Sequence, residues 1–168
     1  MANETIGGFR AIHGMDPQHL IPQITRTKIY DSVYWKEKCF GLTAETFMDR
    51  AVELKYVGGT YGGISKPTHF LCLVLKLLQL QPEDDIIDWL LDQEDFKYLR
   101  ALAAFYIRLT AKAPEVYKKL EPHYADYRKL SVRTAQSWEL LCIDQFVDSL
   151  LRDERCCDIT LPYMTKRT

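Results

Sequence analysis

The sequence predicts an all-α fold: a compact, irregular bundle of short helices around one central buried helix. Apolar residues recur at spacings of three and four positions in several segments, as on one face of a helix. No window alternates apolar and polar residues for long, and no Asn-Gly or Asp-Gly turn marks a hairpin. The run from Phe70 to Leu80 is apolar on nearly every side, which is typical of a helix in the middle of a core. We therefore expect the central helix at about residues 67–80.

The N-terminal third is expected to form a loose arm followed by three helices. Residues 1–14 contain three glycines and little periodic pattern, so we expect a flexible arm there and a single helical domain over residues 15–165. Asp16 and Pro17 are typical of a helix start, as the N-cap and the first helical residue. The predicted helices run from there to about Tyr30, over Ser32–Cys39, and from Thr43 to about Val57.

Glycine and proline divide the rest of the chain into further short helices. The segment Gly58–Gly63 holds four glycines and is expected to form a tight connection between two packed helices. Residues 129–138 are mixed and polar and are expected to form a loop, with a short strand near Trp138–Ile143 left open. The predicted helices are an acidic one from Pro82 to about Leu91, a longer one over Asp95–Thr110, one from Pro114 that breaks at Glu121-Pro122, and a last one from Asp144.

The net charge does not call for a polyanionic partner, but the charges are unevenly distributed along the chain. The formal net charge is −1, with 47% hydrophobic and 27% charged residues, as in an ordinary globular protein. Between Glu83 and Asp95 seven residues are acidic and none is basic, whereas six basic residues oppose three acidic ones between Lys112 and Arg133. Such a dipolar surface suits a specific protein partner at least as well as RNA, and two solvated helix faces would give the same pattern.

The five cysteines predict reduced thiols rather than a disulfide framework. Their number is odd, their spacing is irregular, and no apolar signal segment precedes them, which favours the cytosol or the nucleus. The longest apolar run is about half the length needed to span a bilayer. We therefore expect no membrane partner.

No arrangement of residues predicts catalysis or a bound cofactor. The glycines at 58–63 lack the Lys-Ser/Thr pair and the preceding strand of a P-loop. His69 and Cys72 have a spacing that could ligate a metal, but no second pair completes a site, and a place in the core is the favoured interpretation. Cys156 and Cys157 follow two arginines that could lower a thiol pKa, which leaves a thiol enzyme as one alternative. We expect no enzyme, no cofactor, no metal and no small-molecule substrate.

Charge, aromatic placement and loop chemistry indicate three candidate surfaces for a protein partner, since Tyr and Trp are enriched in interface hot spots. These surfaces are Tyr61 in the glycine-rich segment, Asp84, Asp85, Asp88 and Trp89 on the acidic helix, and Lys97, Arg100 and Arg108 on the expected outer face of the longer helix. The alternative is a direct RNA-binding module in the basic segment 118–133. Its contact residues would be Lys118, Lys119, Arg128 and Lys129.

Seven stretches of the sequence together resemble the N-terminal domain of the pre-mRNA-splicing factor 38 family. They cover nearly the whole chain, and their combination is specific although none of them is a chemical motif. The stretches are Ile12–Ile21, Ile29–Thr46, Glu53–Gly63, Lys66–Pro82, Glu94–Thr110, Tyr117–Leu130 and Asp144–Leu151. The segment 129–138 departs from the family pattern. The chain ends at Lys166-Arg167-Thr168, where animal members carry an Arg/Ser-rich tail, so targeting through such a tail is not predicted.

The resemblance implies a nuclear, non-enzymatic scaffold of the spliceosomal tri-snRNP that is needed when the spliceosome is activated. It also implies two partners, a zinc-finger tri-snRNP protein and a microfibrillar-associated-protein-like splicing factor, both of which offer helical segments. Such partners bind as helices laid into a groove or onto a surface. The resemblance transfers no contact residues, because no motif encodes the family's contacts position by position.

Overall fold

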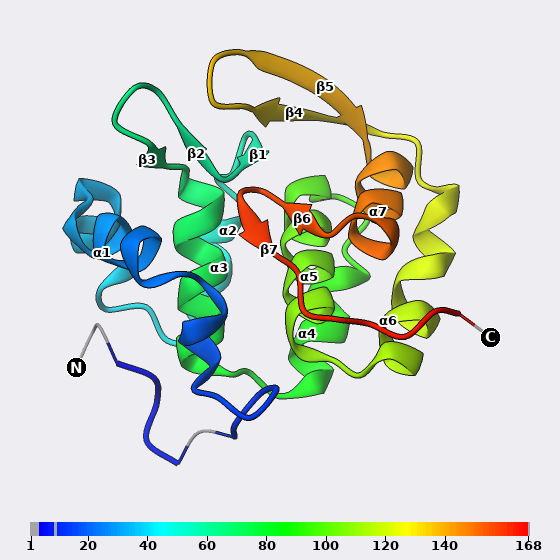
Figure 1. The fold of residues 1–168 in the computed structure, drawn as a ribbon, viewed down its shortest axis with the longest axis horizontal. Helices are drawn as coiled ribbons and strands as arrows, with labels where there is room; N and C mark the ends of the chain where they lie inside the picture. Colours follow the sequence, from blue (N-terminus) through cyan, green and yellow to red (C-terminus); the bar gives the residue numbers. More distant parts are fainter. Residues whose placement is uncertain (1–3, 9, 168) are drawn as a thin grey trace.

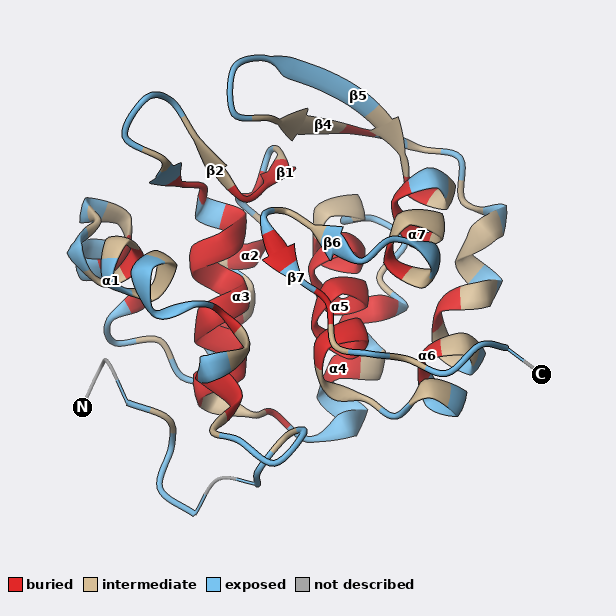
Figure 2. Cartoon of the chain, viewed as in Figure 1, coloured by how far each residue is buried: buried red, intermediate tan, exposed pale blue. Residues whose placement is uncertain are grey.

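Two neighbouring helices form the centre of the molecule. The computed structural model describes residues 4–8 and 10–167. In it, α3 (His69–Leu80) and α5 (Lys97–Thr110) pack side by side (Figure 1) and are buried along most of their length (Figure 2). Thr68 caps α3, because its Oγ1 accepts a hydrogen bond from the Leu71 amide at 3.1 Å. The predicted central buried helix is therefore confirmed.

Shorter helices surround this pair, and proline sets several of their limits. The sequence predicts one helix from Asp16 to Tyr30, but two are present, because the extended backbone at Pro22 ends the first and starts the second. Asp16 caps the first of them by accepting a hydrogen bond from the Gln18 amide at 3.2 Å. The surrounding helices are η1 (Pro17–Leu20), α1 (Gln23–Asp31), the π-helix η2 (Trp35–Cys39), α2 (Phe47–Ala51), α4 (Asp84–Leu91), α6 (Ala113–Leu120), the 3-10 helix η3 (Glu121–Ala125) and α7 (Ile143–Arg152).

The prediction of an all-α fold is wrong, because three small sheets join the helices in a mixed α and β fold. The largest sheet has the order β1-β4-β5, with β1 parallel to β4 and β4 antiparallel to β5. The other two are the antiparallel pairs β2-β3 and β6-β7. Strands β1 to β5 gather beyond one end of α3 and α5 (Figure 1). The strands are β1 (Val57–Gly58), β2 (Thr60–Tyr61), β3 (Lys66–Pro67), β4 (Lys129–Arg133), β5 (Trp138–Cys142), β6 (Arg155–Cys156) and β7 (Ile159–Thr160).

The β4–β5 hairpin replaces the loop predicted at residues 129–138, and the strand left open near residues 138–143 is present. Leu130 is buried, whereas Trp138 and Leu140 are 58% and 67% exposed. The turn contains no glycine. The Thr134 amide donates to the Ser137 carbonyl at 2.9 Å, and the Ser137 amide donates to Thr134 Oγ1 at 3.0 Å. The hairpin therefore lacks both the turn residues and the sustained apolar alternation by which a sequence reveals one.

The glycine-rich segment holds β1 and β2 against the C-terminal hairpin, instead of simply connecting two helices. A Cβ atom on Gly59 would overlap the carbonyl group of Cys157, in the turn between β6 and β7, so only glycine allows this approach. Asp158 connects the same turn to β2, because its Oδ2 accepts hydrogen bonds from the amide and the hydroxyl of Thr60 at 2.8 and 2.9 Å. The end of the chain therefore packs on its middle.

One hydrophobic core extends through the molecule and includes residues from Ile21 to Leu161. At its centre Phe70 of α3 meets Phe105 of α5 and Phe146 of α7 edge to face, with ring centroids 5.8 and 6.4 Å apart. None of the helices within residues 4–8 and 10–167 is long and apolar enough to cross a membrane.

The expected flexible arm over residues 1–14 falls partly outside the described residues, which leave out 1–3 and 9. The part that is described runs along the end of α3. The Ile6 amide donates to the Gln79 carbonyl at 2.9 Å, and the Arg10 amide donates to Gln81 Oε1 at 2.8 Å. The flexibility of the arm and the limits of the single domain stay predictions.

Candidate interaction surfaces

Helix α4 turns an acidic, partly aromatic face toward solvent. Ile87, Leu90 and Leu91 are buried and fix the orientation of the helix. On the opposite side Ile86 and Trp89 are 39% and 50% exposed. We call this side the acidic face; its residues are Asp84, Asp85, Ile86, Trp89 and Asp92. The first two aspartates also stabilise the positive end of the helix dipole.

Asp88 is not part of the acidic face, because it forms an ion pair with Lys119 of α6. The distance from Lys119 Nζ to Asp88 Oδ1 is 3.0 Å. Burial would lower the pKa of Lys119, but the hydrogen bond and the negative charge of Asp88 outweigh it and raise that pKa. A residue proposed to bind protein and one proposed to bind RNA thus partner each other.

Arg100 and Arg108 are buried, so the interpretation of their helix face as an outer face is wrong. They are only 9% and 6% exposed. Arg100 Nε donates to the Leu91 carbonyl at 2.8 Å, and Arg108 Nε donates to the Leu150 carbonyl at 2.7 Å. Both carbonyls lie in the last turn of a helix, where the helix itself supplies no donor. The two arginines therefore hold neighbouring helices together inside the protein.

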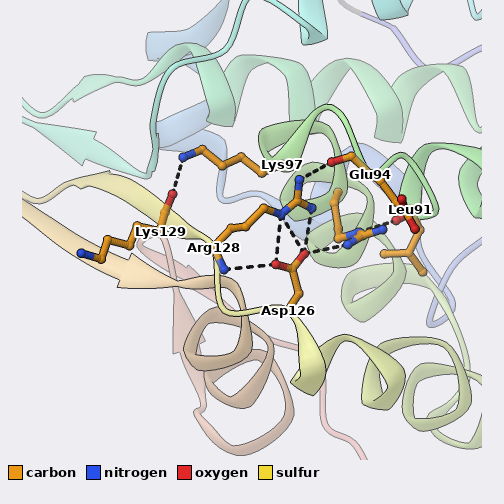
Figure 3. A network of polar contacts seen from close by, with 7 residues as sticks. Leu91, Glu94, Lys97, Asp126, Arg128 and Lys129 are labelled. Carbon is orange, nitrogen blue, oxygen red and sulfur yellow. Dashed lines mark hydrogen bonds and ion pairs between the residues drawn. The ribbon is translucent and has the colours of Figure 1, made fainter.

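A polar junction centred on Asp126 joins α5 to the segment between η3 and β4 (Figure 3). The carboxylate accepts hydrogen bonds from Arg100 Nη1 at 2.6 Å and from Arg128 Nη2 at 2.8 Å. Burial would raise the pKa of Asp126, but the hydrogen bonds and charges of Arg128 and Arg100 outweigh it and hold that pKa well below its usual range. Arg128 also donates to the Glu94 carbonyl. The charged groups of the junction thus connect α5 to the segment between η3 and β4.

The remaining members of the basic segment are spread over different elements. Lys118 is exposed on α6, and Lys129 is exposed at the start of β4. Lys97 of α5, proposed for a protein partner, donates to the Lys129 carbonyl at 2.5 Å. This bond uses the backbone of Lys129 and not its charge. Lys119 and Arg128 form ion pairs, so the exposed cations among the four proposed contacts are Lys118 and Lys129, which lie on separate elements. Binding by this segment stays a prediction without geometric support.

Tyr61 lies half-buried on β2, near the β4–β5 hairpin. The guanidinium carbon of Arg133 lies 4.9 Å from the centroid of its ring. The Gly62 amide donates to the Ala135 carbonyl at 3.0 Å and connects the two hairpins. A part for Tyr61 in partner binding stays a prediction.

A groove that the sequence did not reveal lies beside the N-terminal end of α3. Its volume is about 550 Å³, and Tyr34, Tyr56 and His69 line it. The expected core position is wrong for His69, which is exposed and stacks on Tyr34, and right for Cys72, which is buried. Burial raises the pKa of Cys72 to about 12. The single signal in the sequence was the placement of tyrosines near helix ends.

Cys156 and Cys157 lie next to each other, and Cys157 does not have the environment of an activated thiol. Their sulfur atoms are 3.8 Å apart. The hydrogen bond from Cys156 and burial both raise the pKa of Cys157 well above 9.0, whereas a nucleophilic thiol needs a lowered pKa. All five cysteines are free thiols, and within the described part of the chain no group of three His, Cys, Asp or Glu side chains is placed to hold a metal ion.

Exposed aromatic rings, an acidic helix face and a tyrosine-lined groove on a mixed α and β fold are features typical of domains that bind other macromolecules. The chain belongs to the PRP38 family, whose model matches residues 10–168. The resemblance to the pre-mRNA-splicing factor 38 family is therefore confirmed.

Known relatives agree with this membership. Pre-mRNA-splicing factor 38A is 56% identical over 168 residues in Xenopus tropicalis and 55% identical over 168 residues in Homo sapiens. Pre-mRNA-splicing factor 38 of Drosophila melanogaster is 54% identical over 169 residues. These alignments cover 99 to 100% of this chain and 51 to 54% of the relatives, so the chain spans about half their length.

A solved structure shares the fold. A chain of the crystal structure of the Snu23–Prp38–MFAP1(217–258) complex of Chaetomium thermophilum matches with a TM-score of 0.90 and 45% sequence identity. The match covers 95% of this chain and 84% of that chain. The small sheets and the helices thus form a fold already seen in a complex of three proteins.

Proposed function

We propose that this chain is a non-enzymatic, nuclear scaffold of pre-mRNA splicing that binds other splicing proteins and is needed when the spliceosome is activated. The observation that carries the proposal is the match at 45% identity to a chain solved in complex with other splicing proteins. The proposed partners are proteins like Snu23 and MFAP1, which correspond to the zinc-finger and microfibrillar-associated-protein-like partners expected from the resemblance.

The acidic face of α4 is the docking surface that the geometry favours most. Trp89 is half-exposed on a well-anchored helix, with Ile86 beside it. A tryptophan in such a place can act as a hot spot. Asp85 and Asp92 lie four positions before and three positions after it, which makes them its neighbours on the helix surface, and Asp84 adds a further negative charge at the helix start. The complementary partner is an amphipathic helix with basic residues flanking its apolar stripe.

Calorimetry with the MFAP1 segment 217–258 seen in the Chaetomium complex tests this proposal. The purified chain should bind the segment, and the double change Ile86→Ser and Trp89→Ala should weaken binding by about 30-fold or more, as for a hot spot. Trp138→Ala is the matched control, since Trp138 is also exposed but lies on β5; it should bind like the wild type.

The possible negative results separate an error in the scaffold function from an error in the assigned surface. If the wild-type chain binds neither this segment nor Snu23, the scaffold function is wrong. If both bind and the change at Ile86 and Trp89 has no effect, the function stands and the assignment of the acidic face is wrong. Depletion of the chain from a splicing extract tests the step at which it acts. In the depleted extract spliceosome assembly should proceed and activation should stop, and adding the chain back should restore activation.

A further inference from the structure

A row of aromatic rings crosses the surface between the N-terminal helices and the β4–β5 hairpin. Tyr34 stacks on His69, with ring centroids 3.8 Å apart and planes 5° apart. His69 lies 6.3 Å from Tyr56, and Tyr56 meets Trp138 edge to face at 5.0 Å. Four rings from four separate segments of the sequence are thus neighbours on one surface.

Arg133 extends this row beyond Trp138. Its guanidinium carbon lies 5.4 Å from the Trp138 ring centroid and 4.9 Å from the Tyr61 ring centroid. Glu139 follows Trp138, and because side chains alternate along a strand it points to the opposite face of β5. We call the continuous set the aromatic row; it consists of Tyr34, His69, Tyr56, Trp138, Arg133 and Tyr61.

Positive charge surrounds the aromatic row. Lys38 and Lys55 line the groove of about 550 Å³ that the first three rings border, and both are exposed. Lys66 is exposed and close enough to lower the pKa of His69, after the larger effect of burial. The carboxylate in the groove, Glu53, forms an ion pair with Arg50 at 3.3 Å. The surface therefore carries a net positive charge in a chain whose net charge is −1.

We propose that the aromatic row and its lysines bind single-stranded RNA. Bases of an unpaired strand stack on aromatic rings, while cations along the groove attract the phosphates. A base-paired helix hides the faces of its bases, so a duplex cannot use the rings. This site shares only Arg133 with the basic segment 118–133 and contains none of the four contact residues proposed there. It also lies on other elements than the acidic face of α4, which would repel a polyanion. The inference goes beyond the protein scaffold and does not depend on it.

Fluorescence titration with a single-stranded oligouridylate tests the proposal. In a Trp89→Phe background Trp138 is the one exposed tryptophan, because Trp35 is 1% exposed, and base stacking should quench its emission. His69→Ala or Tyr34→Ala should weaken binding by about 5- to 150-fold, the equivalent of one lost stack. Lys38→Ala and Lys55→Ala should each reduce the slope of log K against log salt by about 0.7.

The controls separate this site from general attraction of anions. Lys118→Ala removes an exposed lysine on α6 and should leave both affinity and salt slope nearly unchanged. Absence of binding, equal binding of a duplex, or equal sensitivity to Lys118→Ala would overturn the proposal. It would also fail if polyglutamate bound as tightly as the oligouridylate and the ring variants had no effect, because the surface would then be a site for acidic proteins. Urea unfolding of each variant confirms that its fold is intact.

Discussion

The guanidinium groups of Arg100 and Arg108 cap two neighbouring helices. A helix leaves the carbonyls of its last turn without partners. Arg100 donates to the last residue of α4 and Arg108 to the last turn of α7. Arginine suits this role because its guanidinium group carries several donors in a fixed fork. Its apolar stem can pack in the core at the same time.

We expect Arg108→Met to lower the free energy of unfolding by about 1–3 kcal/mol, because the methionine fills the space but leaves the Leu150 carbonyl buried without a donor. Arg152→Met is the matched control: the side chain of Arg152 is 75% exposed and paired with Asp148, so its loss should lower stability much less than the loss of Arg108. Urea unfolding measures both. A more stable Arg108→Met variant would show that burial of the charge costs more than the hydrogen bond contributes.

Single residues were predicted well where the local sequence decides their role. Asp16 caps a helix as expected, because an N-cap acts on amides two or three residues away. Arg100 and Arg108 were misplaced, because their partners lie 9 and 42 positions away along the chain. Helical spacing shows which residues share a face, but it does not show whether a neighbouring helix covers that face.

At the scale of elements, the contact between the glycine-rich segment and the β6–β7 turn holds two hairpins together. Gly59→Ala should lower the free energy of unfolding by about 1–3 kcal/mol, because the added Cβ would meet the rigid backbone of Cys157. Gly63→Ala is the control, since its Cβ would meet nothing within 4 Å. Thermal and urea unfolding compare the two; equal stability would mean that the turn moves aside freely.

Elements with strong local signals were predicted, and those that depend on distant partners were not. Helix α3 was evident because its apolar residues surround it on all sides, and α4 because Pro82 and the acidic first turn mark its start. Strand β1 has two residues and pairs with β4, about seventy-five positions later. The aromatic row was missed for the same reason, since Arg133 and Trp138 reach the other rings on β4 and β5, of which β4 pairs with β1.

For the whole molecule, Asp126 is expected to be a main source of sensitivity to acid. Folding lowers the pKa of this carboxyl from its ordinary 3.8, so the folded state binds the proton less readily than the unfolded state. The stabilisation by Asp126 is therefore complete above pH 3.8 and is lost as the pH falls from there toward the folded pKa.

Asp126→Asn should lower the free energy of unfolding at neutral pH by about 3 kcal/mol, because it leaves two guanidinium groups without their carboxylate. It should also flatten the dependence of stability on pH below 3.8. Unfolding by urea at several pH values measures both effects. Asp85→Asn on the exposed side of α4 removes only a favourable contact with the helix dipole and should lower stability by less than about 1 kcal/mol. Parallel curves for the wild type and Asp126→Asn would assign the acid sensitivity to other groups.

The packing of the chain's end on its middle has a consequence for synthesis on the ribosome. Strand β1 cannot pair until β4 has left the exit tunnel, and Thr60 cannot bind until Asp158 follows. Since chains emerge at about 5–20 residues per second, helices α3 and α5 exist for seconds with part of their apolar surface uncovered. The nascent chain should therefore recruit chaperones until the β6–β7 hairpin has left the exit tunnel, and release them abruptly once that hairpin docks.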